Sequence, residues 1–304
     1  MSKISFISDV DGIRVDKYIS EKLEDYSRSF IKKLIDDYKV RVNGNIVKTN
    51  FKVRLNDVIE IDIYNPKKLE IVPQNIKIDV IYEDDDIIVV NKPKNMVVHP
   101  APGNDAGTLV NALLAHCNGK LSDLGGDMRQ GIVHRIDKDT TGVLVIAKNN
   151  DAHYKLSKLF CAHDINRKYI AIVYGVIKND RGTIDAPIGR HPIDRKRMAI
   201  NLKNGKNAVT HFKVLERFLD STLIEVTLET GRTHQIRVHM SSIGFPIVGD
   251  LIYGRKKDKY GLDSQVLHAK MLGLVHPRTG EYVEFDSKLP EYFDNLIKKL
   301  RNEK

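Results

Sequence analysis

The stretch GIVHRIDKDTTGVLVIAK, from Gly131 to Lys148, constrains the fold of this chain more than any other. Its second half, Gly142 to Ala147, is an uninterrupted apolar run, as in strands that are buried on both faces. A dense polar cluster stands directly before this run, where a buried strand would begin. The residues of the cluster are His134, Arg135, Asp137, Lys138, Asp139, Thr140 and Thr141. The pattern predicts a polar loop held at the edge of a buried sheet.

Asp137 and Arg135 are the residues of this loop that could take part in catalysis. An Asp close to an Arg can stay ionised while partly buried, because the positive charge offsets the cost of desolvation. An ionised, partly buried carboxylate can act as a nucleophile or a base. The alternative interpretation of these two residues is a charged turn with a surface ion pair. Two distant segments of the chain favour the catalytic interpretation.

These segments are RKYIAIVYG, from Arg167 to Gly175, and LETGRTHQIRVHM, from Leu228 to Met240. Together with HRIDKDTTG they resemble the motifs of the RluA family of RNA pseudouridine synthases. The resemblance is strongest to the RluD-like branch, which modifies large-subunit (23S) ribosomal RNA and carries an N-terminal S4-type RNA-binding domain. Three more segments support it: IYEDDDIIVVNKPKNMVVHP (Ile81 to Pro100), IGRHPIDRKRMAI (Ile188 to Ile200) and PIVGDLIYG (Pro246 to Gly254).

The resemblance implies that the chain isomerises uridine to pseudouridine without a cofactor or a metal ion. It assigns Asp137 as the catalytic carboxylate, which either attacks the sugar or removes a sugar proton. Arg135 would anchor the RNA backbone and help the base leave the stack. Tyr169 would stack on uracil and assist proton removal from C5, and Arg237 would pair with Asp137. The alternatives are a structural ion pair for Arg135, a core tyrosine for Tyr169 and a helix-surface arginine for Arg237.

Composition agrees with an RNA partner. The net charge is +9 and the isoelectric point is near 9.3, which suits a polyanion. No apolar run suggests a signal peptide or approaches the roughly 20 residues that span a membrane, so we expect a cytoplasmic protein. No glycine-rich phosphate loop predicts a nucleotide cofactor. Cys117 and Cys161 lie in apolar, helical contexts that predict buried thiols, and His234 and His239 are five apart, which does not match a helical zinc site.

The first 65 residues are expected to form a small S4-like α/β domain. Val15 to Leu23 and Phe30 to Ile35 show helical spacing, with Ser27 as the cap of the second helix. Asn43-Gly44 predicts a tight hairpin, and Tyr38, where the family often has glycine, must tolerate an unusual backbone conformation. About 12 basic and 11 acidic residues nearly balance, so we expect this domain to orient RNA rather than dominate its binding. Its expected RNA contacts are Arg28, Lys32, Lys33 and Arg41.

Residues 66–75 are predicted to be a linker, and residues 76–304 to form the catalytic domain. Its mixed helical and strand patterns predict an α+β fold, with a largely antiparallel mixed sheet flanked by helices. Thr108, Asn150 and Pro290 are expected at the starts of helices, and a further helix is expected from Thr233 to Ile243. A basic loop beside the cleft is expected to grip an RNA stem. Its cations are Arg190, Arg195, Lys196 and Arg197.

The functional hypothesis is therefore a pseudouridine synthase that acts on 23S ribosomal RNA, near helix 69, as free RNA or in the pre-ribosomal large subunit. Two alternatives stay open: a related synthase for transfer RNA, and a non-catalytic RNA-binding assembly factor. We expect a monomer. The sequence does not identify the modified uridines.

Overall fold

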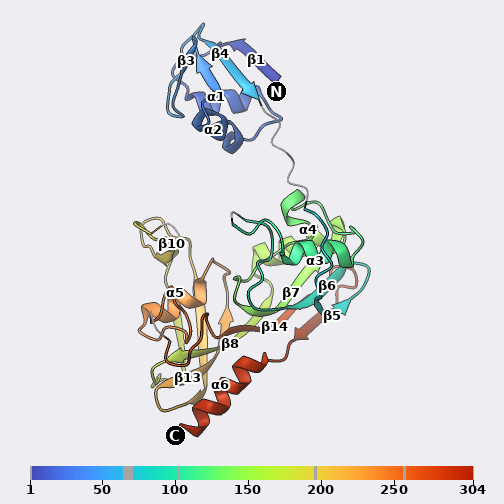
Figure 1. Ribbon diagram of the computed structural model, residues 1–304, viewed down its shortest axis with the longest axis vertical. Coiled ribbons are helices and arrows are strands. Elements are labelled where there is room, and N and C mark those ends of the chain that lie inside the picture. Colours follow the sequence, from blue (N-terminus) through green and yellow to red (C-terminus); the bar gives the residue numbers. More distant parts are fainter. Residues whose placement is uncertain (1, 64–70, 102, 195–196, 256–257, 304) are drawn as a thin grey trace. The chain divides into compact units, whose positions relative to one another are not determined.

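The computed structural model of this chain describes residues 2–63, 71–101, 103–194, 197–255 and 258–303 (Figure 1). The chain divides into two compact units, Met1–Leu69 and Glu70–Lys304. Within the described residues no helix is long and apolar enough to cross a membrane.

The first unit is a four-stranded antiparallel sheet with two helices. Its helices are α1 (Val15–Lys22) and α2 (Arg28–Asp36), and its strands, in the order β1-β4-β2-β3, are β1 (Ser2–Ile7), β4 (Val58–Ile63), β2 (Val40–Val42) and β3 (Asn45–Ile46). Apolar side chains of both helices, including Ile19 and Leu34, share one buried core with Ile61 of β4. Strand β1, which pairs with β4 over its whole length, is an addition to the predicted elements.

Local sequence signals explain the turns of this unit. The Ser27 hydroxyl accepts the Phe30 N–H and caps α2, as predicted. Asn43 and Gly44 both have positive φ, 51° and 75°, as the predicted tight hairpin between β2 and β3 requires. Tyr38 has φ 60°, so a bulky, exposed residue adopts the left-handed conformation that usually favours glycine.

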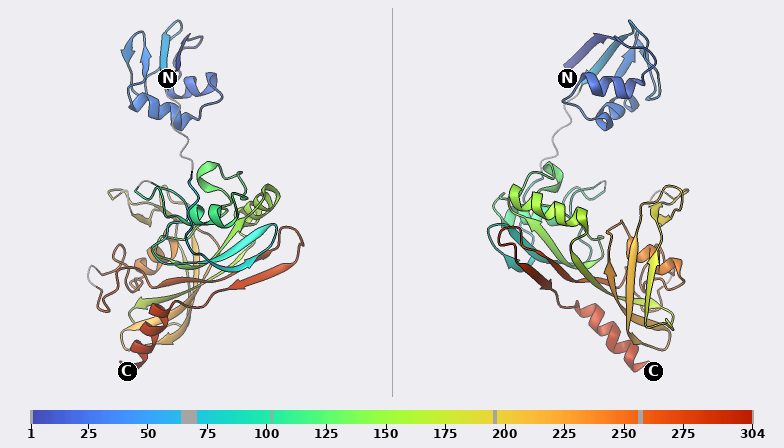
Figure 2. Two further views of the ribbon diagram at one scale, coloured as in Figure 1. Left: turned by 45° about the vertical axis from the view of Figure 1, so that its right-hand side comes forward. Right: turned by 180° about the vertical axis from the view of Figure 1, so that it is seen from behind.

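The second unit is built on a twisted, largely antiparallel sheet of nine strands in the described residues (Figures 1 and 2). The strands, in sheet order, are β5 (Asp79–Glu83), β6 (Ile87–Lys92), β7 (Thr141–Ala147), β14 (Leu267–Val275), β8 (Asn166–Tyr174), β13 (Ser221–Leu228), β12 (Val209–Arg217) and β9 (Arg181–Asp185), with β15 (Tyr282–Asp286) paired to β14. The pair β7–β14 is parallel, and the other neighbours are antiparallel. Two short strands, β10 (Ile188–Arg190) and β11 (Met198–Ile200), form a separate hairpin, which we call the arm.

Helices cover both faces of this sheet. They are α3 (Leu109–His116), α4 (Asn150–Ala162), α5 (Gln235–Ser242) and α6 (Glu291–Asn302), with a short 3-10 turn, η1 (Asp127–Arg129). Alternation along β8 explains the layers, because Ala171 and Val173 pack with α5, whereas Ile170 and Ile172 pack with α6. Strand β7 is buried along its whole length, as its apolar run predicted.

Three details correct the sequence-based expectations. Helix α4 is capped by Asn149, whose side chain accepts the Ala152 N–H, and not by Asn150, which instead bonds with Ser122. Helix α5 begins at Gln235 rather than Thr233, because His234 has a left-handed backbone with φ 56°. Cys161 is exposed and only Cys117 is buried, since Cys161 lies on a side of α4 turned away from its buried residues. Thr108 does cap α3, as predicted, and Pro290 directly precedes α6.

Candidate active site

The polar loop before β7 is held by groups from three sides. At its end, a Cβ on Gly142 would lie 2.2 Å from the Ala269 carbonyl oxygen, so only glycine lets β14 approach the start of β7 this closely. The fully buried Lys92 Nζ donates to the Lys138 carbonyl at 2.8 Å and to two further carbonyls nearby. His134 Nε2 accepts the Val145 N–H at 3.0 Å. The position of Asp137 is therefore determined by the sheet and not by the loop alone.

Asp137 is paired with a cation that is itself held from behind. Arg237 Nη1 donates to Asp137 Oδ2 at 3.1 Å, as expected from the resemblance. The same guanidinium binds Asp250 with two parallel bonds, Nε to Oδ2 at 2.7 Å and Nη2 to Oδ1 at 3.0 Å. Burial would raise the pKa of Asp250, but the contacts with Arg237 outweigh it and the pKa is lowered. Asp250 thus fixes the orientation in which Arg237 presents its remaining donors to Asp137.

A chain of hydrogen bonds reaches the other oxygen of Asp137. The Met198 N–H donates to Tyr253 Oη at 2.8 Å, and that hydroxyl lies 2.7 Å from His234 Nδ1. Since the hydroxyl oxygen accepts from Met198, its proton points to Nδ1, and the neutral ring carries its proton on Nε2. Burial lowers the pKa of His234, which favours this neutral form. His234 Nε2 faces Asp137 Oδ1 at 3.8 Å, so both carboxylate oxygens face an N–H donor.

Arg135 is not the ion-pair partner of Asp137. It is exposed and lines the pocket, but it forms no ion pair with Asp137 in the described part of the chain. The physical reason is that Asp250 orients Arg237 toward Asp137, whereas no carboxylate of the described residues pairs with Arg135. The interpretation of Arg135 as the charge partner of Asp137 is therefore wrong.

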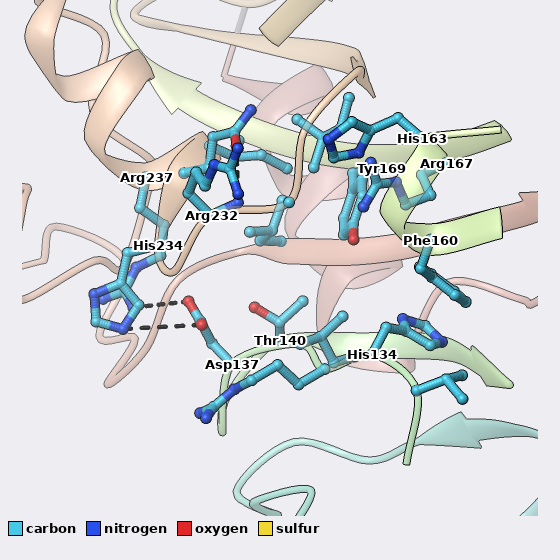
Figure 3. Close-up of a pocket in the computed structure, with 18 of the residues that line it drawn as sticks. His134, Asp137, Thr140, Phe160, His163, Arg167, Tyr169, Arg232, His234 and Arg237 are labelled. Carbon is cyan, nitrogen blue, oxygen red and sulfur yellow. Dashed lines mark hydrogen bonds and ion pairs between the residues drawn. The ribbon is translucent and has the colours of Figure 1, made fainter. Parts of the chain in front are cut away.

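Asp137 and Tyr169 line one pocket of about 500 Å³ (Figure 3). The Tyr169 ring comes from β8 and faces this pocket, and its hydroxyl has no hydrogen bond among the described residues. Burial raises the pKa of this hydroxyl, which keeps it protonated near neutral pH. Apolar side chains of Ile136, Leu228 and Leu267 line the same space. The pocket therefore combines a paired carboxylate, a free phenol and apolar walls.

Cations without carboxylates lie on the opposite side of the pocket from Asp137. Arg167, two residues before Tyr169 on β8, lies there with His163 at the end of α4 (Figure 3). Arg232 also lines the pocket, and electrostatic repulsion from it lowers the pKa of both Arg167 and His163, after the larger effect of burial. Among the described residues that line the pocket, Asp137 is the only carboxylate.

The structure locates the expected RNA contacts in two places. Arg28, Lys32, Lys33 and Arg41 are exposed on the first unit. Arg28 is already hydrogen-bonded to the buried Asp16, at 3.0 Å from Nη2 to Oδ2. In the arm, Arg190 is exposed and Arg197 stacks on the Tyr253 ring, with Cζ 5.3 Å from its centre. Arg195 and Lys196 lie outside the described residues.

Several pocket residues have no role predicted from the sequence. Arg167 and Tyr169 are two apart in one strand, which places them on the same face, so alternation could have indicated Arg167. Asp250 and Tyr253 lie together in PIVGDLIYG, and the sequence spacing bears on His234 only as a possible zinc ligand. Its partner in that comparison, His239, is buried and bonds with Thr210 and Ala186.

Known families match both units. A family profile described as "RNA pseudouridylate synthase" matches residues 86–242, and one described as "S4 domain" matches residues 13–59.

Relatives match nearly the whole chain. A Bacillus subtilis protein named "Uncharacterized RNA pseudouridine synthase YlyB" is 52% identical over 95% of this chain and 94% of its own length. Proteins named "Ribosomal large subunit pseudouridine synthase D" are 44% identical in Zymomonas mobilis, over 98% of this chain and 97% of theirs, and 42% identical in Pseudomonas aeruginosa, over 97% and 94%. Among solved structures, "Human RNA Pseudouridylate Synthase Domain Containing 4" matches with a TM-score of 0.58 and 27% identity, over 73% of this chain and 93% of that one.

Proposed function

Because this chain belongs to the RNA pseudouridylate synthase family, we propose that it modifies uridines of 23S ribosomal RNA and that Asp137 is its catalytic carboxylate. The observation that supports the substrate is the similarity, over at least nine-tenths of both chains, to proteins named for the large ribosomal subunit. This similarity extends through the S4 domain, which favours the ribosomal substrate over transfer RNA. The helix 69 stem-loop is the proposed target, and the enzyme acts as a monomer in the cytoplasm.

The reaction breaks the C1′–N1 bond, turns the uracil over and joins C5 to C1′, while C5 loses a proton and N1 gains one. Arg237 pairs with Asp137 and orients it for its step, whether Asp137 attacks the sugar or removes a sugar proton. The Tyr169 ring stacks on uracil, and its hydroxyl, which has no hydrogen bond among the described residues, assists the loss of the C5 proton. These roles need only groups that line one pocket.

RNA contacts outside the pocket complete the proposal. Arg135, exposed at the rim and without an ion pair among the described residues, meets the RNA backbone where the nucleotide leaves the stack. The exposed cations of the predicted S4-like domain, residues 1–65, orient the RNA. Those of the arm, including Arg195 and Lys196 outside the described residues, grip a stem.

The test is pseudouridine mapping of total RNA, by carbodiimide-blocked primer extension, in cells without the gene. Complementation compares the wild-type gene with Asp137→Asn. We expect 23S stops to disappear and to return only with the wild type. Lost transfer-RNA sites with intact 23S sites would overturn the substrate, return of the stops with Asp137→Asn would overturn the catalytic residue, and no change at any site would favour a non-catalytic RNA-binding factor.

A further inference from the structure

Arg167 is a buried cation without a carboxylate partner in the described residues. The residue is 8% exposed, and one donor, Nη2, bonds to the Glu229 carbonyl at 3.1 Å. Its Nε is buried and has no hydrogen-bond partner. A buried guanidinium is costly unless an anion compensates it. The described residues supply no anion at this place, so it is suited to a ligand that brings one.

The surroundings of Arg167 keep this place open. A Cβ on Gly231 would lie 2.6 Å from Arg167 Nη1, so the exposed glycine leaves room for the guanidinium at the pocket wall. Arg232 uses its Nε on the Asn207 carbonyl and likewise has no ion pair among the described residues. The nearby Glu229 carboxylate is bound to His211 at 2.7 Å. Arg167, Arg232 and His163 therefore line this side of the pocket. The adjacent Glu229 carboxylate is engaged by His211.

We propose that Arg167, Arg232 and His163 bind one phosphodiester of the RNA strand, adjacent to the uridine that enters at Asp137; this rests on the proposed function. A phosphodiester bears a permanent charge, and arginine forks match its oxygens well. Gly231 and His163 are exposed, so the phosphate stays at the rim, where RNA can leave the pocket. The subsite lies on the opposite side from Asp137 (Figure 3), so it fixes the direction in which the strand crosses the site.

The experiment uses a stem-loop RNA with the target uridine and a set in which each nearby phosphodiester is replaced, one at a time, by an uncharged methylphosphonate. Dissociation constants are measured for wild type and Arg167→Gln, both in the Asp137→Asn background to prevent turnover. We expect Arg167→Gln to weaken binding about tenfold and to lower the salt slope by about 0.7, the value for one single-strand phosphate. A methylphosphonate at the bound position, and at no other, should weaken binding to wild type by the same factor. Combining that RNA with Arg167→Gln should weaken binding no further.

Arg181→Gln is the matched control, because Arg181 is exposed on β9 and does not line the pocket. Gly231→Ala is a second variant, expected to show the same coupling by displacing Arg167. Equal weakening of every RNA in the set by Arg167→Gln would overturn the proposal. The proposal would also be overturned if Arg167→Gln left RNA affinity unchanged but reduced turnover in the enzyme that retains Asp137. That result would favour a contact between Arg167 and uracil.

Binding of inorganic phosphate tests the subsite independently of the proposed function, because this test requires no RNA substrate. It should shift the His163 imidazole resonance of wild type but not of Arg167→Gln, and no shift in wild type would overturn the subsite. Coupling to one phosphodiester in an RNA that is never isomerised would uphold the subsite and overturn the substrate.

Discussion

The two sides of the pocket differ in how their charges are balanced. Asp137 has a protein partner, since Arg237 lies between Asp137 and the buried Asp250. Near Arg167 the described residues supply no carboxylate partner. The first side is therefore organised before RNA arrives, as electrostatic catalysis requires. The second side is incomplete on its own, as a binding subsite for an anion would be. The presence or absence of an ion pair thus distinguishes the catalytic groups from the groups that bind a ligand.

The largest effect should come from Asp137. Asp137→Asn keeps the shape of the side chain and removes its charge, so turnover should fall by a factor on the order of 10⁴. Release of tritium from C5 of labelled uridine in RNA measures this directly. Asp139→Asn, in the same loop, is the matched control and should retain most activity. A loss below tenfold for Asp137→Asn would contradict its assignment.

The stability of the folded protein should respond oppositely at the two sides. Arg237→Met leaves the buried Asp250 unpaired and should lower the free energy of unfolding by about 3–5 kcal/mol. Arg167→Met removes a buried cation that has no anion, so the free protein should be unchanged or about 1 kcal/mol more stable. Urea unfolding without RNA compares the two variants. Equal destabilisation by both would break the distinction between the paired and unpaired sides.

The hydrogen-bond chain through Tyr253 should affect the rate and not binding. Tyr253→Phe removes the hydroxyl that holds His234 in one tautomer, so kcat should fall about tenfold, as for other residues that orient a functional group. The KM for RNA should stay within about twofold.

His234→Gln supplies the control for this prediction, because its amide can direct an N–H to Asp137 without Tyr253. In that background Tyr253→Phe should have little effect on kcat. Additive losses in the double variant would show that Tyr253 does not act through His234.

The sequence predicted features that neighbouring residues determine. The cap at Thr108, the turn at Asn43-Gly44 and the buried strand after Thr141 each depend on a few adjacent side chains, and each is present. Asp137 and Arg237 are 100 residues apart, and only the family resemblance brought them together.

Tertiary contacts decided what the sequence could not predict. Arg135 lies two residues from Asp137 in the chain, yet Asp250 makes the distant Arg237 the partner. The left-handed backbone of His234 shortens α5 and directs the ring to Tyr253 and Asp137. The importance of Arg167 lies in a partner that is missing, and no pattern of residues in the sequence reveals the absence of a contact.

The smallest predicted effect is a pH dependence at His163. Burial, and then Arg167 and Arg232, lower the pKa of His163 in the free protein. A bound phosphate offsets the two arginines and raises this pKa, so binding takes up part of a proton. RNA affinity should therefore rise as the pH falls through the ordinary range of histidine, by less than the tenfold per pH unit that uptake of one proton allows. His163→Asn is the control, since asparagine tolerates the left-handed backbone at this position, with φ 60°. The variant should lose this dependence while keeping its fold, and an unchanged dependence would assign the proton to another group and remove His163 from the subsite.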